Sequence, residues 1–147
     1  DAEQKILRNK EGDITLSGIN ISSLKITKVY KGDLKIGDII KLGERYYITD
    51  ENGKEKVVYD GNYLPSTVGK EYLFFLGNKQ TNKDYWSGTY APKLLEKGRY
   101  PVRTRNGSNF LSVQSIESMT NKELNLGNDD STEYKALYEQ VAQKYMK

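Results

Sequence analysis

The chain has 147 residues, the length of one typical domain, and only 36% of them are apolar. It contains no Cys and no His, which excludes disulfides, thiolate metal sites, thiol nucleophiles and imidazole acid–base catalysis. A net charge of +3 is too small to indicate nucleic-acid binding by itself. No apolar run approaches the ~20 residues that a transmembrane helix needs.

Residues 1–102 are predicted to be β-structure. Residues 4–8 form a short apolar strand, and residues 14–30 form one long strand. In the long strand the alternation of apolar residues slips by one position at Gly18, and again around Ser22 and Ser23. Because one extra residue turns the buried face of a strand over, these slips predict bulges and strong bending.

The strands that follow are shorter. Residues 31–38 form a compact connection, and strands are predicted at residues 39–42, 45–49, 56–59, 72–76 and 99–102. Asn52-Gly53 is the strongest short hairpin signal in the chain, because Asn and Gly accept positive φ angles.

The last third changes to helical periodicity. Thr120 and Glu123 fit a capping box for a short helix that ends at Gly127, within a loop region of residues 103–130. A second box at residues 130–133 starts a terminal amphipathic helix over residues 131–147. Its apolar stripe consists of Tyr134, Leu137, Tyr138, Val141 and Tyr145. We expect a single domain, 1–147, in which this helix packs on a barrel made by residues 1–102.

The predicted fold class is mainly β: a five- or six-stranded antiparallel barrel of OB type with a C-terminal helix. Residues 25–38 (KITKVYKGDLKIGD) carry the pattern V-x-K-G followed by G-D-x-I. Residues 68–76 (VGKEYLFFL) carry G-x-E-Y-L-x-F-L. These segments resemble the netrin-like, or tissue-inhibitor-of-metalloproteinase-like, OB-type barrel of secreted Bacillus-type bacterial lipoproteins, over roughly residues 14–102.

The resemblance implies an extracellular Gram-positive lipoprotein, held at the membrane only through a lipid on a Cys upstream of Asp1. The animal inhibitors of this superfamily chelate their target's zinc with an N-terminal Cys. This chain has none, so that activity is not expected.

No cofactor and no metal site is expected. The acid pair Asp50/Glu51 is explained as a hairpin turn, and the pair Asp129/Asp130 as a helix cap. Neither pair fits the spacing of a calcium loop, which ends in a bidentate Glu.

Aromatic residues are the candidate ligand-binding group, because Tyr and Trp present flat faces to sugars, bases and peptides. The alternative is that they fill the core or hold loops in place. The function this predicts is a non-catalytic binding or protein-interaction module, with a protein, a peptide or a cell-wall glycan as partner. The candidate residues are Tyr46, Tyr47, Tyr63, Tyr85, Trp86 and Tyr90.

Two other functions are weighed against this one. A single-stranded nucleic-acid-binding OB domain needs a basic groove beside the aromatics, but acidic residues interleave with the available cations. Those cations are Lys79, Lys83, Lys93, Lys97, Arg99, Arg103 and Arg105. A minimal hydrolase needs two converging carboxylates, or a Ser–Lys pair such as Ser66 and Lys70. That pair has no helical context, so an enzyme is not expected.

Overall fold

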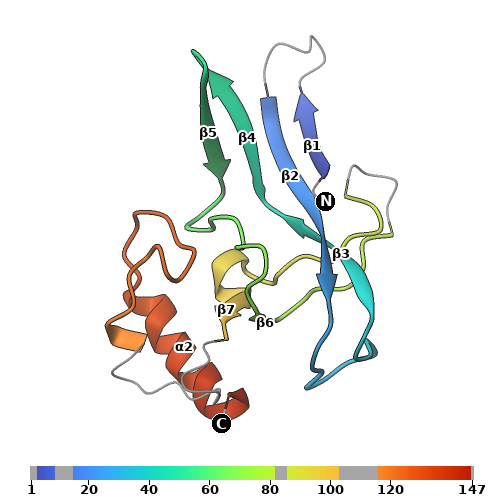
Figure 1. The fold of residues 1–147 in the computed structure, drawn as a ribbon, viewed down its shortest axis with the longest axis vertical. Helices are drawn as coiled ribbons and strands as arrows, with labels where there is room; N and C mark the ends of the chain where they lie inside the picture. Colours follow the sequence, from blue (N-terminus) through green and yellow to red (C-terminus); the bar gives the residue numbers. More distant parts are fainter. Residues whose placement is uncertain (1–2, 9–14, 82–85, 103–115, 147) are drawn as a thin grey trace. The chain divides into compact units, whose positions relative to one another are not determined.

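The computed structural model describes residues 3–8, 15–81, 86–102 and 116–146 (Figure 1). Within them the chain is mainly β, with antiparallel strand pairs and one C-terminal helix, which confirms the fold class at this level. The chain divides into two compact units. Unit 1 is Asp1–Asp60 with Leu76–Ala91, and unit 2 is Gly61–Phe75 with Pro92–Lys147. The expected single domain stays a prediction.

Unit 1 contains a three-stranded antiparallel sheet and a two-stranded hairpin (Figure 1). The sheet has the order β1 (Glu3–Arg8), β2 (Thr15–Lys25), β3 (Ile39–Glu44). The hairpin consists of β4 (Tyr46–Glu51) and β5 (Lys54–Tyr59). All five strands overlap their predicted ranges, but the long strand predicted over residues 14–30 ends at Lys25.

The turn between β4 and β5 confirms the hairpin signal. Asn52 and Gly53 both have positive φ, at 55° and 80°, as a two-residue hairpin loop requires. The Gly53 N–H donates a 2.9 Å hydrogen bond to Asp50 Oδ1. Asp50 is therefore a turn residue, as expected.

The bulges predicted at Gly18, Ser22 and Ser23 are wrong. Pairing of β2 with β3 runs without a shift from Asn20 to Lys25, and the shift in its pairing with β1 falls beside Leu7 and Arg8. No reversal of the buried face is needed, because Ile19, Asn20 and Ile21 are all buried and both faces of the strand are therefore covered.

Gly18 has a different role. A Cβ atom at this position would lie 2.7 Å from Tyr47 Cβ and 2.8 Å from its ring. The glycine therefore lets the Tyr47 side chain of β4 lie directly on the backbone of β2. This is a long-range packing requirement, and the local sequence pattern does not distinguish it from a bulge.

Two side-chain amides join β1 and β2 to the edge of β4. The Gln4 amide donates to Ile48 O (3.1 Å) and accepts from Ile48 N–H (2.7 Å), as a neighbouring strand would. Asn20 Nδ2 donates to Gln4 Oε1 and to Tyr46 O, both at 3.0 Å. The edge of β4 is thus occupied at Tyr46 and Ile48.

Unit 2 is built from a short strand pair, a 3-10 turn and the terminal helix (Figure 1). The pair is β6 (Tyr72–Phe74) with β7 (Arg99–Pro101), η1 is Leu95–Gly98, and α2 is Thr132–Tyr145. The helical stripe is confirmed, since it enters the core of this unit. The core residues are Leu73, Tyr100, Ile116, Met119, Leu124, Leu126, Tyr134, Tyr138, Ala142 and Met146.

Tyrosine hydroxyls fix α2 to β7. Tyr134 OH donates to Arg99 O at 2.6 Å, and Tyr138 OH donates to Pro101 O. The helix begins after Asp130, whose Oδ1 accepts from Thr132 N–H (2.9 Å) and Thr132 Oγ1 (2.6 Å). These bonds lower the pKa of the Asp130 carboxyl. The N-cap itself is Ser131, which makes no side-chain capping bond, so Asp130 supports the start of the helix from one residue before the cap.

The region before α2 differs in part from the expectation. Thr120 and Glu123 make the reciprocal capping bonds, with Glu123 N–H donating to Thr120 Oγ1 at 3.2 Å. Residues 121–125 nevertheless form turns instead of a short helix, because Asn125 has a φ of 57° and cannot continue one. Residues 103–115 of the predicted loop lie outside the described residues.

No closed barrel is found among the described residues. Their pairing gives one three-stranded and two two-stranded sheets. The five- or six-stranded barrel is therefore not confirmed.

Candidate functional site

The predicted aromatic residues do not form one surface. Tyr46 and Tyr47 are neighbours on β4, so their side chains point to opposite faces, and both are half-buried. Burial, and secondarily the charge of Glu44, raises the pKa of the Tyr46 phenol. Tyr47 lies against Gly18, as described above. Tyr85 lies outside the described residues.

Tyr63 belongs to the core of unit 2. Its side chain is 1% exposed, and the guanidinium of Arg99 lies 3.8 Å from the centre of its ring. Its flat face is therefore covered by a side chain of the protein. We leave it out of the proposed ligand surface.

The basic residues required for nucleic-acid binding are also dispersed. Arg99 is 0% exposed, and Lys97 forms a 3.0 Å ion pair with Glu133. Lys83, Arg103 and Arg105 lie outside the described residues. Lys79 and Lys93 are exposed, but they belong to different units.

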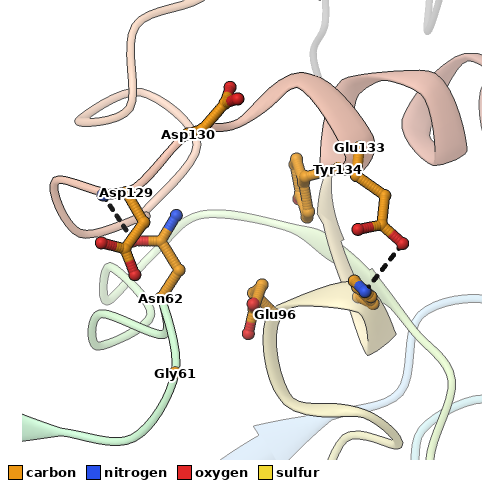
Figure 2. Close-up of a pocket in the computed structure, with 8 residues that line it drawn as sticks. Gly61, Asn62, Glu96, Asp129, Asp130, Glu133 and Tyr134 are labelled. Atoms are coloured by element: carbon orange, nitrogen blue, oxygen red, sulfur yellow. Dashed lines mark hydrogen bonds and ion pairs between the residues drawn. The ribbon is translucent and has the colours of Figure 1, made fainter.

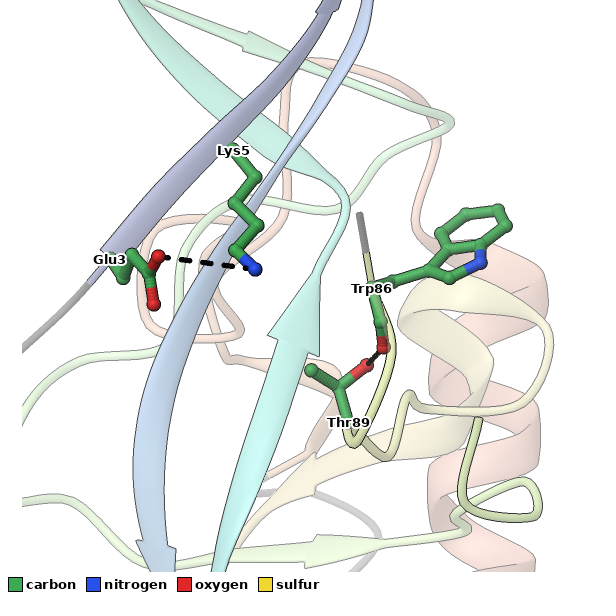
Figure 3. Close-up of polar contacts among 4 residues, drawn as sticks. All are labelled: Glu3, Lys5, Trp86 and Thr89. Carbon is green, nitrogen blue, oxygen red and sulfur yellow. Dashed lines mark hydrogen bonds and ion pairs between the residues drawn. The ribbon is translucent and has the colours of Figure 1, made fainter. Parts of the chain in front are cut away.

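Trp86 and Thr89 lie on one turn of unit 1 (Figure 3), and Tyr90 follows Thr89 directly. The carbonyl of Trp86 accepts from Thr89 N–H at 3.2 Å and from Thr89 Oγ1 at 2.6 Å. The Arg45 guanidinium lies 5.0 Å from the centre of the Trp86 ring. Thr89 is buried, and its Oγ1 would lie 3.1 Å from a Cβ atom at Gly43, so the turn covers β3 at that glycine.

The same turn pairs with β3 at one position and then leaves it. Tyr90 N–H donates to Lys41 O and Gly43 N–H donates to Tyr90 O, both at 2.8 Å. Gly88, at a φ of 82°, instead directs its N–H to Gln80 O at 2.8 Å. The turn therefore contacts β3 at Gly43 and at Lys41 O, but does not bond to Lys41 N–H or to Ile39.

A groove of about 480 Å³ opens where the turn leaves the strand. It is lined by Leu34, Asp38, Ile39, Ile40, Lys41, Lys79, Gly88 and Tyr90. Of the predicted aromatic residues, Tyr90 is the one that lines this groove. Sequence analysis missed Ile39 and Lys41, although Ile39-Ile40 carried a signal: neighbours on a strand point to opposite faces, and a one-sided core buries one of them.

The groove combines apolar surface with positive charge. Ile39 is 70% exposed, whereas Ile40 is buried. Lys41 and Lys79 are exposed cations at its rim. Asp38, the acidic residue among the described residues of the lining, accepts a 2.8 Å hydrogen bond from Lys35 N–H through Oδ2.

A second hollow, of about 220 Å³, lies in unit 2 (Figure 2). It is lined by Gly61, Asn62, Glu96, Lys97, Asp129, Asp130, Glu133 and Tyr134. It is smaller than the ~300 Å³ at which ligand pockets usually begin. Within the described part of the chain, no three or more acidic side chains are grouped so that they could hold a metal ion.

The hydrolase alternative finds little support in this hollow. Glu133 is paired with Lys97, and Asp130 accepts from Thr132 N–H at the start of α2. The pKa of Asp130 is lowered, whereas a general acid needs a raised pKa. The Ser66 hydroxyl, a candidate nucleophile, accepts a 3.0 Å hydrogen bond from Arg99 Nη1. The groove of unit 1 is therefore the better candidate for a functional site.

The buried tyrosines of unit 2 predict a loss of stability in alkali. Burial, with a smaller contribution from Glu96, raises the pKa of Tyr100 to about 12, and burial raises that of Tyr134 well above 10.0. A phenol whose pKa is raised by folding stabilises the fold below its unfolded pKa. That stabilisation disappears as the pH rises through the folded pKa. The free energy of unfolding should fall by about 1.4 kcal/mol per pH unit per phenol between about pH 10 and 12.

Denaturant unfolding followed by the helical circular dichroism of α2 measures this slope. Tyr100→Phe should reduce it, whereas Tyr30→Phe, at a 45% exposed position of unit 1, should leave it unchanged. If the free energy of unfolding of Tyr100→Phe falls with pH as steeply as that of the wild type, the burial of this phenol is contradicted.

Comparison with known proteins gives no further guide to function. No protein-family model, curated protein or solved structure matches the chain. None of the helices within the described residues is long and apolar enough to cross a bilayer.

Proposed function

We propose that this chain is a non-catalytic binding module and that the groove beside β3 is its ligand site. The observation that carries the proposal is the exposure of Ile39 in a groove of about 480 Å³ that Lys41 and Lys79 also line. Covering an Ile side chain is worth about 1.5–3 kcal/mol, and a concave site that combines apolar surface with a few polar groups is typical of ligand binding.

The chemistry of the groove favours binding over catalysis. Its titratable lining residues are Asp38, Lys41, Lys79 and Tyr90. A carboxylate-dependent glycosidase requires two carboxyl groups across the scissile bond, and the described residues that line this groove supply one. That carboxyl group already accepts a backbone hydrogen bond from Lys35.

The proposal also includes the location of the protein in the cell and a more specific fold. We place the module on the surface of a Gram-positive bacterium, held by a lipid on an upstream Cys, on a barrel of OB/netrin-like type. The resemblance of residues 25–38 and 68–76 supports this, and so do the amide bonds of Gln4 and Asn20 that join β4 to the sheet.

Mass measurement and detergent partitioning of the native protein test the anchor. A diacylglycerol-sized addition supports it, and an unmodified protein in the soluble fraction contradicts it.

Selection of linear peptides from a phage-displayed random library tests the ligand site. We expect enriched peptides to bind the wild-type chain and to lose affinity at least about tenfold in Ile39→Asp. Since Ile39 is 70% exposed, this substitution should leave the fold intact. The matched control is Val68→Asp, at a fully exposed position of unit 2, and it should bind as the wild type does.

Three results would contradict the proposal. One is the absence of enrichment of peptides, together with no binding of soluble cell-wall glycan fragments. Another is equal affinity for the wild type and Ile39→Asp. The third is tight binding of a thymidine homopolymer that weakens steeply with salt, which would favour the nucleic-acid alternative.

A further inference from the structure

The outer edge of β3 leaves backbone groups without a partner. Lys41 C=O and Gly43 N–H point away from β2, since both bond to Tyr90. Alternate residues of a strand direct their backbone groups to the same side, so Ile39 N–H, Ile39 C=O and Lys41 N–H also point outward. Among the described residues, none of these three groups has a hydrogen-bond partner on that side.

The groove lies beside these groups. Tyr90 occupies one position next to β3, and Gly88 then turns the chain toward Gln80. An extended segment placed in the groove would continue the line that the Tyr90 segment begins. It would meet the outward Ile39 N–H, Ile39 C=O and Lys41 N–H groups at strand spacing.

We infer that the groove binds an extended peptide as an added strand on β3, with Lys41 and Lys79 holding a carboxylate of that peptide. This inference rests on the proposed function, because it names the ligand class of the same groove. Strand addition obtains affinity from main-chain hydrogen bonds and specificity from alternate side chains.

The side chains beside this edge define the peptide. Ile39 and Lys41 lie on the same face of β3, because they are two residues apart. Ile39 offers apolar contact. Among the described lining residues, Lys41 and Lys79 outnumber the acid Asp38, whose carboxylate already accepts from Lys35 N–H. A peptide with an apolar side chain and a nearby carboxylate complements this surface.

The edge of β4 differs from the outer edge of β3. Along β4, the amides of Gln4 and Asn20 already bond to Ile48 and Tyr46. An edge whose backbone groups are occupied by side chains does not accept an added strand, whereas an unoccupied edge does. This contrast favours β3 over β4 as the strand that accepts the peptide.

Backbone methylation of a selected peptide tests strand addition directly. N-methylation removes one donor at a time, so affinity should fall about tenfold or more at every second residue and change little between them.

Lys41→Gln and Lys79→Gln should each weaken binding about fivefold, as should conversion of the peptide's carboxylate to an amide. In the lysine variants that conversion should have a smaller effect. Lys54→Gln on β5 is the matched control and should have no effect.

The outcomes separate this inference from the proposed function. If Ile39→Asp abolishes binding but the methylation scan shows no alternation, the groove binds ligand without strand addition and the inference is wrong. Binding of glycan fragments at Ile39 in place of peptide would have the same meaning. Self-association in sedimentation that Ile39→Asp abolishes and peptide does not displace would assign the edge to a second copy, and would also overturn the inference.

Discussion

The Arg99→Met variant should lose about 4 kcal/mol of the free energy of unfolding of unit 2. Arg99 is fully buried, and its guanidinium donates to Leu64 O (2.7 Å), Ser66 Oγ (3.0 Å) and Asn125 O (2.7 Å). Hydrogen bonds to charged groups contribute about 1.5–3 kcal/mol each, and Met leaves buried acceptors without a donor. The packing against Tyr63 is lost as well.

Denaturant unfolding monitored by the helical signal of α2 measures this loss. The matched control is Arg45→Met, since Arg45 is exposed and its 3.7 Å ion pair with Asp60 is at the surface. A surface pair of this kind is worth about 0–1 kcal/mol. Equal stabilities of the two variants would contradict the buried position of Arg99.

A single methyl group at Gly98 should destabilise unit 2 by about 3 kcal/mol. A Cβ atom there would lie 2.2 Å from Lys93 O and 2.8 Å from Lys93 N. Both are backbone atoms, so the clash cannot be relieved by rotating a side chain, and overpacking of this kind costs about 1–3 kcal/mol or more. Gly98 ends η1 immediately before Arg99, so a shift here also displaces the guanidinium.

The control for this prediction is Gly77→Ala. A Cβ atom there would lie 3.7 Å from Ala91 O, an ordinary contact, so the change in stability should stay within about 1 kcal/mol. Thermal melts of the two variants compare the positions. A Gly98→Ala melt as high as that of Gly77→Ala would show that the backbone near Lys93 is not packed on Gly98.

Local patterns predicted the elements of this fold well. The Asn-Gly turn, the alternating strands and the helical stripe each depend on neighbouring residues, and each appears where it was expected. Gly18 was misread because its role depends on Tyr47, which is distant in the sequence. Arg99 was misread as a surface cation because its acceptors come from residues 64–66 and 125.

The candidate site was predicted less well for the same reason. Aromatic residues were selected by type, but their positions depend on packing: Tyr63 entered a core and Tyr47 lies on a glycine. The groove forms where the chain turns away from β3 at Gly88. This position depends on hydrogen bonds between residues that are distant in the sequence. The local sequence signal for the groove was the pair Ile39-Ile40, since neighbours on a strand point to opposite faces.

Amide hydrogen exchange at β3 tests strand addition most directly. With a selected peptide bound, the account predicts slower exchange at the Ile39 and Lys41 amides, which point outward. The Ile40 and Leu42 amides, which face β2, should change little. Unchanged exchange at Ile39 and Lys41 in the saturated complex, or protection that appears on β5 instead, would contradict the account.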